Sequence, residues 1–217
     1  MTMLAFHNNP KIAAKFRRRA RMHQKADEIV QGTGWESNGK TRGCCVGCLM
    51  HAYPAHAEFE PQIGVPEVIA HLADAIHEGL ARAAAKKWPV AFIAAIPVGA
   101  DLSLVWPRFA LWMFSNPAAP AFRNSRDDAA CCKAVDAVAA LFRRWVETAV
   151  KPSMRDFAAA EEQANTARAW TWALASASAR ASASAGAWAR ASASVWRQMR
   201  DVMLRLLSEA PVETNRV

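Results

Sequence analysis

The residue types that could carry chemistry gather in one segment of the chain, between Gly32 and Glu60. Three cysteines and two histidines lie there within thirteen positions: Cys44, Cys45, Cys48, His51 and His56. Such a set has four interpretations. It could be a metal site, the active site of a thiol enzyme, an anion-binding loop, or a tight loop in which buried cysteines and glycines have only a packing role.

Zinc is the metal that these side chains suit. Cys45 and Cys48 with His51 and His56 would supply two thiolates and two imidazoles for a tetrahedral ion. The spacing differs from that of a zinc finger, whose two ligand pairs are separated by about a dozen residues. The sequence therefore requires no cofactor, although zinc stays open as the metal of this segment.

A thiol-dependent hydrolase or transferase is the alternative function. A cysteine at the amino end of a helix has its thiolate stabilised by backbone N–H groups, and a histidine can take up its proton. Cys44 or Cys48 would be the nucleophile and His56 the base. Glu58 or Glu60 could then orient the imidazole.

The glycines of the segment also permit a bound anion to approach the backbone closely. Residues 34–41 read GWESNGKT and match the P-loop pattern, but a P-loop follows a buried strand, and here a helix is predicted instead. We therefore expect a simple anion-binding loop rather than an NTPase, with Trp35 stacking on a base or ring. Its candidate ligand-binding residues are Trp35, Asn38, Gly39, Lys40, Arg42 and Gly43.

Positive charge is concentrated in the first 50 residues. The chain has a net charge of +8, and residues 1–50 hold nine Lys/Arg against three Asp/Glu. A helix predicted over residues 10–30, with Asn9 as N-cap, exposes a polar face that carries Arg17, Arg18 and Arg21. This face is either a solvated surface or part of a ligand site. The charge favours an anionic small molecule, a nucleic acid or a host defence protein as partner and disfavours a DNA mimic.

The elements that must position these residues are predicted to be helical. Apolar residues recur at helical spacing, and Pro, Gly and Asn mark the ends. The fold class is therefore mostly all-α: a helical bundle with a long glycine- and cysteine-rich loop over residues 31–65. The predicted helices cover residues 10–30, 46–52, 66–80, 90–96, 102–115 and 127–150.

The last third of the chain predicts a long helix rich in alanine and serine, in which ARASAS occurs twice. Its large residues form one stripe, which would pack against a second helix. We expect a continuous helix, a hairpin folded near Gly186, or a helix pair that makes the protein a homo-oligomer. The stripe consists of Trp170, Leu174, Ala181, Trp188, Trp196, Met199 and Met203. The expected domains are a core over 1–152, a helical extension over 153–210 and a disordered tail over 211–217.

Composition narrows the class of protein further. An apolar share of 53% over 217 residues is ample for a core. No apolar run reaches the roughly 20 residues that span a bilayer, and no secretory leader is evident. Five cysteines, an odd number, are a poor disulfide framework. A cytoplasmic protein without a membrane partner is therefore expected.

Several motifs together resemble a family of uncharacterised proteins from tailed phages and prophages. They are AFHN-x-P at residues 5–10, VQGTGWE and NGK within residues 30–40, GC-x-VGC at residues 43–48 and IGVPE at residues 63–67. His56 and the alanine-repeat tail add to the resemblance, which covers about two thirds of the chain. This chain departs from the family at Cys45, where a small residue is usual, and at Thr41 and Arg42. The family has no assigned activity, so the resemblance implies an accessory phage protein, with an anti-defence role by association.

Overall fold

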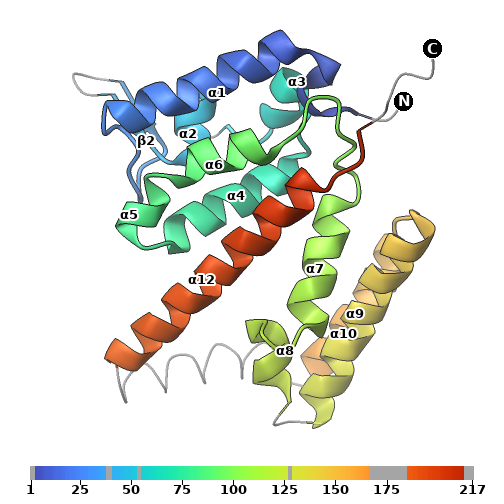
Figure 1. The fold of residues 1–217 in the computed structure, drawn as a ribbon. Coiled ribbons are helices and arrows are strands. Elements are labelled where there is room, and N and C mark those ends of the chain that lie inside the picture. Colours follow the sequence, from blue (N-terminus) through green and yellow to red (C-terminus); the bar gives the residue numbers. More distant parts are fainter. Residues whose placement is uncertain (1–2, 38–40, 53–54, 127–128, 167–184, 213–217) are drawn as a thin grey trace, which may run out of the picture. The chain divides into compact units, whose positions relative to one another are not determined.

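The structure is a computed structural model that describes the chain except residues 1–2, 38–40, 53–54, 127–128, 167–184 and 213–217. The described residues are mainly helical, and the sheet among them consists of two short antiparallel strands (Figure 1). This confirms the predicted, mostly all-α class. No helix in the described part of the chain is long and apolar enough to cross a membrane.

The elements follow one another along the chain in short steps. They are η1 (Ala5–Asn8), α1 (Pro10–Lys25), β1 (Trp35–Glu36), β2 (Arg42–Gly43), α2 (Cys45–Met50), α3 (Phe59–Ile63), α4 (Glu67–Gly79), α5 (Arg82–Ala85), α6 (Trp88–Ala95), α7 (Val105–Ser115), α8 (Pro120–Ser125), α9 (Ala129–Thr148), α10 (Met154–Thr166) and α12 (Ala185–Ser208). In the strands Trp35 pairs with Gly43 and Glu36 with Arg42.

The chain divides into two compact units. Unit 1 contains Met1–Trp106 and Met199–Val217, and unit 2 contains Pro107–Gln198. Helices α7 and α12 each cross a boundary between them. This division differs from the expected one, which placed a single core over residues 1–152.

In unit 1, α1 packs against α6 and α2, and α4 packs against α2 and α6 (Figure 1). The core is apolar and contains Trp88, Phe92 and Phe59, each at most 1% exposed. The indole N–H of Trp88 is buried, and it donates to the Ala73 carbonyl of α4 at 2.8 Å. Removal of these rings from water stabilises the packing of unit 1.

Helix α1 begins as predicted but ends early. Asn9 is the N-cap, since its side chain accepts from the Lys11 N–H at 2.9 Å, and Pro10 occupies the first turn. The predicted end at residue 30 is wrong, because the backbone of Asp27 turns into the left-handed region at a φ of 56°. Val30 N–H then donates to the Gly43 carbonyl at 2.9 Å. The chain after α1 therefore pairs with β2 instead of continuing the helix.

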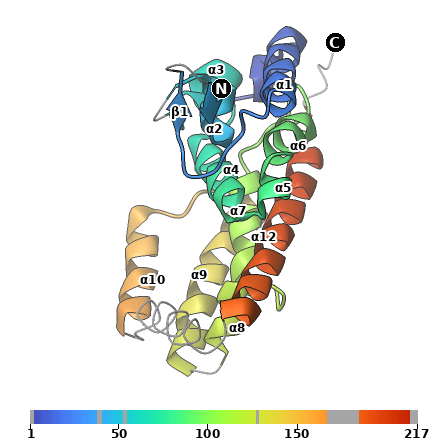
Figure 2. The ribbon, with the colours of Figure 1, turned by 90° about the vertical axis from the view of Figure 1, so that its left-hand side faces the viewer.

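The predicted loop over residues 31–65 contains more regular structure than expected. The short helix expected near residues 46–52 is present as α2, while β1, β2 and α3 were not predicted. We call the described residues 31–37 and 41–43 the strap; Figure 2 shows its β1 segment alongside α2. Strands of two residues carry no periodic signal, so their pairing depends on distant contacts rather than on local sequence.

Helix α4 is shifted slightly from its prediction. Pro66 precedes the helix as its N-cap residue, whereas the sequence predicted it as the first helical residue. The apolar spacing within residues 66–80 predicts an inward position for Val68, but Val68 is 37% exposed. The buried face is formed instead by Ile69, Ala70, Ala73, Ile76 and His77.

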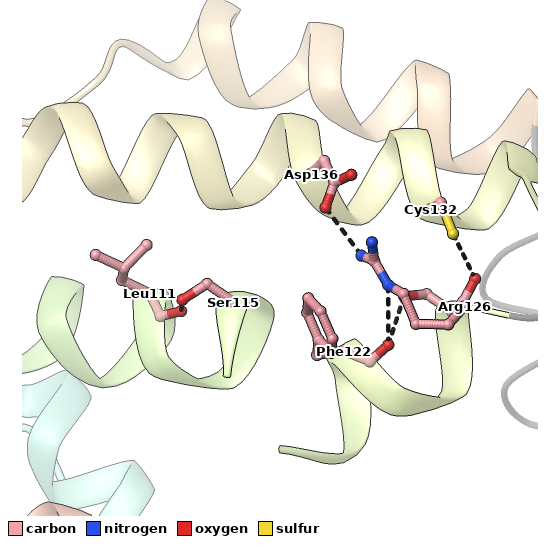
Figure 3. Close-up of polar contacts among 7 residues, drawn as sticks. Leu111, Ser115, Phe122, Arg126, Cys132 and Asp136 are labelled. Carbon is pink, nitrogen blue, oxygen red and sulfur yellow. Dashed lines mark hydrogen bonds and ion pairs between the residues drawn. The ribbon is translucent and has the colours of Figure 1, made fainter. Parts of the chain in front are cut away.

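In unit 2, α9 packs against α8 and α10. Figure 3 shows the side chain of Arg126, after α8, directed toward Asp136 of α9. The Arg126 guanidinium donates to Asp136 at 2.9 Å, and the Cys132 thiol donates to the Ser125 carbonyl at 3.1 Å. The sequence does not predict α8, because a proline such as Pro120 usually marks the end of a helix. Pro120 lies in the first turn, where its missing N–H has no cost.

The tail contains α10 and α12. Gly186 is the second residue of α12, and the residues directly before this helix lie outside the described part of the chain, so the hairpin predicted near Gly186 stays a prediction. Residues 167–184, with the first ARASAS repeat and three members of the stripe, lie outside the described residues. The helix pair and the homo-oligomer therefore stay predictions.

Candidate functional site

The exposed side of α1 is strongly cationic. We call Lys11, Lys15, Arg18, Arg21 and Lys25, all exposed, the basic outer face. At 100° per residue the five positions fall within an arc of about 120°, and at 1.5 Å per residue they extend over about 21 Å. The opposite side of α1 is buried, and the helix contains no acidic residue.

The charges of this face are not neutralised nearby. None of the five cations forms an ion pair with a side chain in the part of the chain that the structure describes. Lys15 contacts an aromatic ring, with its Nζ 5.3 Å from the centre of the Phe16 ring. Lys86, in contrast, is bound to Asp27 in an ion pair. The outer face therefore presents five cations to solvent.

Two further arginines of α1 have structural contacts. Arg17, predicted to bind a ligand, donates from Nη2 to the Ile96 carbonyl at 2.7 Å and lies over the Phe6 ring. Arg19 donates to the Leu49 carbonyl at the end of α2. Of the three arginines predicted for the site, Arg18 and Arg21 are exposed, whereas Arg17 holds α1 against the chain after α6.

Next to α1 lies a group that we call the histidine–tryptophan cluster, formed by His23, Glu28, Trp35 and His51. His23 is 5% exposed, and its Nδ1 lies 2.6 Å from Oε2 of Glu28. Its Nε2 lies 2.8 Å from Nε2 of His51. The Trp35 and His51 rings are stacked, with centroids 4.7 Å apart and planes inclined by 11°. The His23 ring meets both of them edge-on.

The strap positions Trp35 by lying directly on α2. The Cys44 N–H donates to the carbonyls of Thr33 and Gly34 at 2.8 and 3.0 Å. A Cβ added to Gly47 would lie 1.9 Å from the Gly34 oxygen, so the strap approaches α2 more closely than any side chain would allow. The cluster therefore depends on the glycine at position 47.

His51 is fixed by its backbone as well as by its ring. It follows α2 as the C-cap, in the left-handed region at a φ of 59°, and its N–H donates to the Gly47 carbonyl at 2.8 Å. Partial burial of the ring, together with the nearby positive charges of Arg19 and Lys15, lowers the pKa of His51 to about 4. The ring is therefore neutral at physiological pH. Glu28 accepts from His23 Nδ1–H, and a single proton between the two Nε2 atoms joins His23 to His51.

The three cysteines of the segment are buried around α2. Cys44 is the N-cap, with its sulfur accepting from the Gly47 N–H at 3.4 Å, and the Cys48 thiol donates to the Gly43 carbonyl at 3.3 Å. Burial raises the pKa of Cys44 and Cys48 to about 12, and that of Cys45 is also raised. The Asp74 carboxylate contributes to the increase at Cys44. These sulfurs are therefore protonated thiols at neutral pH.

His56, predicted as a base for these thiols, has other partners. Its Nε2 lies 3.2 Å from Oδ2 of Asp74, and its ring stacks on that of His71 at 4.0 Å. Among the described contacts no hydrogen bond joins His56 to Cys44 or Cys48. Asp74 lies between the two groups, since it bonds His56 and also raises the pKa of Cys44.

The predicted zinc ligands Cys48, His51 and His56 each bond to a different partner rather than facing a common point. Cys48 bonds a carbonyl of the strap, His51 bonds His23, and His56 bonds Asp74. Within the described ranges no group of three or more His, Cys, Asp or Glu side chains is arranged to hold a metal ion.

The predicted anion-binding loop is only partly described. Asn38, Gly39 and Lys40 lie outside the described residues. Arg42 of β2 forms an ion pair with Glu36 of β1, with Nε 2.6 Å from Oε2. Gly43 is needed for packing, because a Cβ there would lie 2.8 Å from the Gly34 oxygen. Trp35, also predicted for this loop, stacks on His51 in the histidine–tryptophan cluster.

Sequence reasoning missed His23, Glu28 and Asp74 as site residues. His23 fits the inward helical spacing of α1, so from the sequence alone it is indistinguishable from a core position. The signal that could have identified it is the acidic residue five positions later, which becomes a partner once α1 ends before Glu28. No comparable local signal connects Asp74 to His56, which is 18 residues away.

The basic outer face and the cluster are neighbours, since His23 belongs to α1 and the charge of Lys15 acts on His51. No family model, curated protein or solved structure matches the chain.

Proposed function

We propose that the chain binds nucleic acid through the basic outer face of α1. The observation that carries the proposal is the row of five exposed cations, unpaired among the described residues, along about 21 Å of one helix face. A nucleic-acid strand advances about 3.4 Å per phosphate, so this length faces on the order of six phosphates. Contacts of this kind bind the backbone and do not by themselves read a base sequence.

The shape of the face favours a polymer over a single nucleotide. A mononucleotide is usually held in a concave pocket by a few convergent polar groups. The outer side of α1 is convex and extended, and the cation of the strap that the structure describes, Arg42, is already paired with Glu36. A repeating polyanion matches the row of charges better.

A host defence protein is less well supported as the direct partner. Protein interfaces have a core of apolar and aromatic residues inside a polar rim. The large apolar side chain exposed on this side of α1 is Met22, 60% exposed among the cations. The composition of the face is that of a nucleic-acid-binding surface.

The resemblance to tailed-phage proteins supports a biological setting for this activity. In our proposal the chain is an accessory phage protein of the bacterial cytoplasm, and its anti-defence role would consist of occupying nucleic acid that a host system needs. The thiol-dependent hydrolase or transferase has less support, because the raised pKa values of Cys44 and Cys48 leave few reactive thiolates.

Binding can be tested with the full chain and labelled oligonucleotides of about 20 residues, by fluorescence anisotropy over a range of salt concentrations. The double variant Arg18→Ala/Arg21→Ala removes two cations of the face, while Arg82→Ala/Lys87→Ala removes two exposed cations elsewhere in unit 1. Each lost phosphate contact lowers the slope of log K against log salt by about 0.7 for a single strand. Loss of two contacts changes the slope by about 1.4. Over the tenfold range between about 1 M and 0.1 M salt this is a factor of about 25, so Arg18→Ala/Arg21→Ala should bind about 25-fold more weakly at about 0.1 M salt.

The control variant should retain wild-type affinity within about twofold, since its cations lie outside the face. Equal losses in the two variants would mean that only net charge matters. Absence of binding by the wild-type chain at low salt would refute the proposed function.

A further inference from the structure

We infer that the nucleic acid is single-stranded and that the histidine–tryptophan cluster is a stacking platform for one of its bases. This inference rests on the proposed function and specifies its substrate class. It is carried by the geometry of His51, whose ring stacks on Trp35 although the residue is exposed to solvent.

The contacts of the ring decide where a base could lie. Trp35 covers one face of the imidazole at 4.7 Å, and the Nε2 edge is bonded to His23 at 2.8 Å. His51 is nevertheless exposed to solvent. Among the described residues, no ring stack or hydrogen bond involves the opposite face of the ring or its Nδ1 edge. A base placed there would extend the column of Trp35 and His51 by one ring.

The platform is rigid before any ligand binds. The left-handed backbone of His51, its bond to His23 and the stack on Trp35 fix the ring in three ways. Glu28 in turn holds His23, and the strap that carries Trp35 is bonded to Cys44. A ring held in this way loses little conformational freedom on binding, which increases affinity.

The ring is also electrically suited to stacking. Because its pKa is lowered to about 4, His51 is a neutral aromatic ring at physiological pH rather than a hydrated cation. The positive charge comes instead from Lys15 and Arg19 of α1, which act on the same ring. Phosphates could follow α1 while one base turns toward the platform.

Only an unpaired base can reach such a platform. The bases of a duplex are stacked and paired inside the helix, whereas those of a single strand are free to stack on aromatic side chains. A duplex would therefore contact the basic outer face alone. Single-stranded RNA and single-stranded DNA share the chemistry that the platform recognises, and both are included in the test.

The test compares wild-type chain and His51→Asn on single-stranded RNA, single-stranded DNA and duplex DNA of equal length. Asparagine tolerates the left-handed backbone and keeps a polar group toward His23, so the variant removes the ring with little strain. Stacking of one base is worth about a 5- to 150-fold change in affinity, which is the loss expected for either single strand. Duplex affinity and all salt slopes should stay unchanged, since no charge is removed at neutral pH.

An abasic oligonucleotide gives a second measurement that does not depend on the folding of a variant. Wild-type chain should bind a wholly abasic strand more weakly than a normal strand, by the same factor that His51→Asn costs. His51→Asn should bind the two strands equally, because the base and the ring are two halves of one contact.

The possible results separate the two proposals. In one outcome, single strand and duplex bind with equal, salt-dependent affinity, with no loss in His51→Asn. This result would overturn the proposed stacking platform and would still support binding by the basic outer face. An equal loss of affinity for single strand and duplex would also overturn it. A duplex has no free base to contact the platform, so loss of a base contact cannot weaken its binding. No binding to any of the nucleic acids would refute the proposed function itself.

Discussion

Replacement of Gly47 by alanine should destabilise the protein, although the same change normally stabilises a helix. Gly47 lies in α2, and in an ordinary helical position alanine is better than glycine by about 1 kcal/mol. Here the new Cβ would lie 1.9 Å from the Gly34 oxygen. Because carbon atoms do not approach an oxygen closer than about 3 Å, the strap would have to retreat by more than about 1 Å.

The cost can be worked out from the contacts that such a retreat breaks. The buried Cys44 N–H loses its bonds to the strap carbonyls, which costs about 1–3 kcal/mol. The stack of Trp35 on His51 is worth about 0.5–1.5 kcal/mol more. After the gain in helix propensity is subtracted, the free energy of unfolding should fall by about 0.5–3.5 kcal/mol.

Urea unfolding of the full chain, with hydrogen exchange of the Cys44 amide, would measure both parts of this prediction. The control is Ala14→Gly at an exposed position of α1, which gives the intrinsic difference between the two residues in this protein. It should cost about 1 kcal/mol. A Gly47→Ala chain that is more stable than wild type, with the Cys44 amide still protected, would refute the close contact between strap and helix.

Three further predictions concern acid, the core and the thiols. The pKa of His51 in the folded chain, about 4, lies below its ordinary value of 6.5. Between these two pH values the unfolded chain therefore binds more protons than the folded chain. The free energy of unfolding should fall as the pH drops from 6.5 to about 4. Solvent screening reduces the size of this effect. In His51→Asn the urea midpoint should depend less on pH over the same range than in the wild-type chain. Trp88→Phe removes the bond to Ala73 and leaves a void, so thermal unfolding should show a loss of about 1–3 kcal/mol. At neutral pH iodoacetamide should modify Cys132 first by peptide mass analysis, whereas fast modification of Cys44 or Cys48 would favour the thiol enzyme.

The helices could be predicted from the sequence where their signals are local. Asn9 and Pro10 start α1 through contacts within one turn, and the apolar spacing of α4 and α9 places both helices. The end of α1 could not be predicted, because it depends on bonds between Glu28, Val30 and Gly43. The pairing partner is more than ten residues away in sequence and has no strand pattern of its own.

For the candidate site, the sequence indicated residue types but not partners. The basic helix and Trp35 were recognisable from charge and composition. The pairing of His23 with His51, 28 residues later, arises only when the strap, α1 and α2 come together. The cysteines show the opposite case: their spacing suggests reactive thiols, but burial around α2 makes them weak nucleophiles.

The composition of unit 1 from two distant segments has a consequence for synthesis on the ribosome. Its last part supplies the fully buried Met203 and Leu207, and the Pro211 carbonyl accepts from the Asp101 N–H at 2.8 Å. About 90 residues, those of unit 2, are translated between the two segments. At roughly 5–20 residues per second this takes on the order of 5–20 s, during which α1 and its cations emerge in a unit that is not yet complete. The nascent chain could therefore meet polyanions such as ribosomal RNA before its own fold is closed.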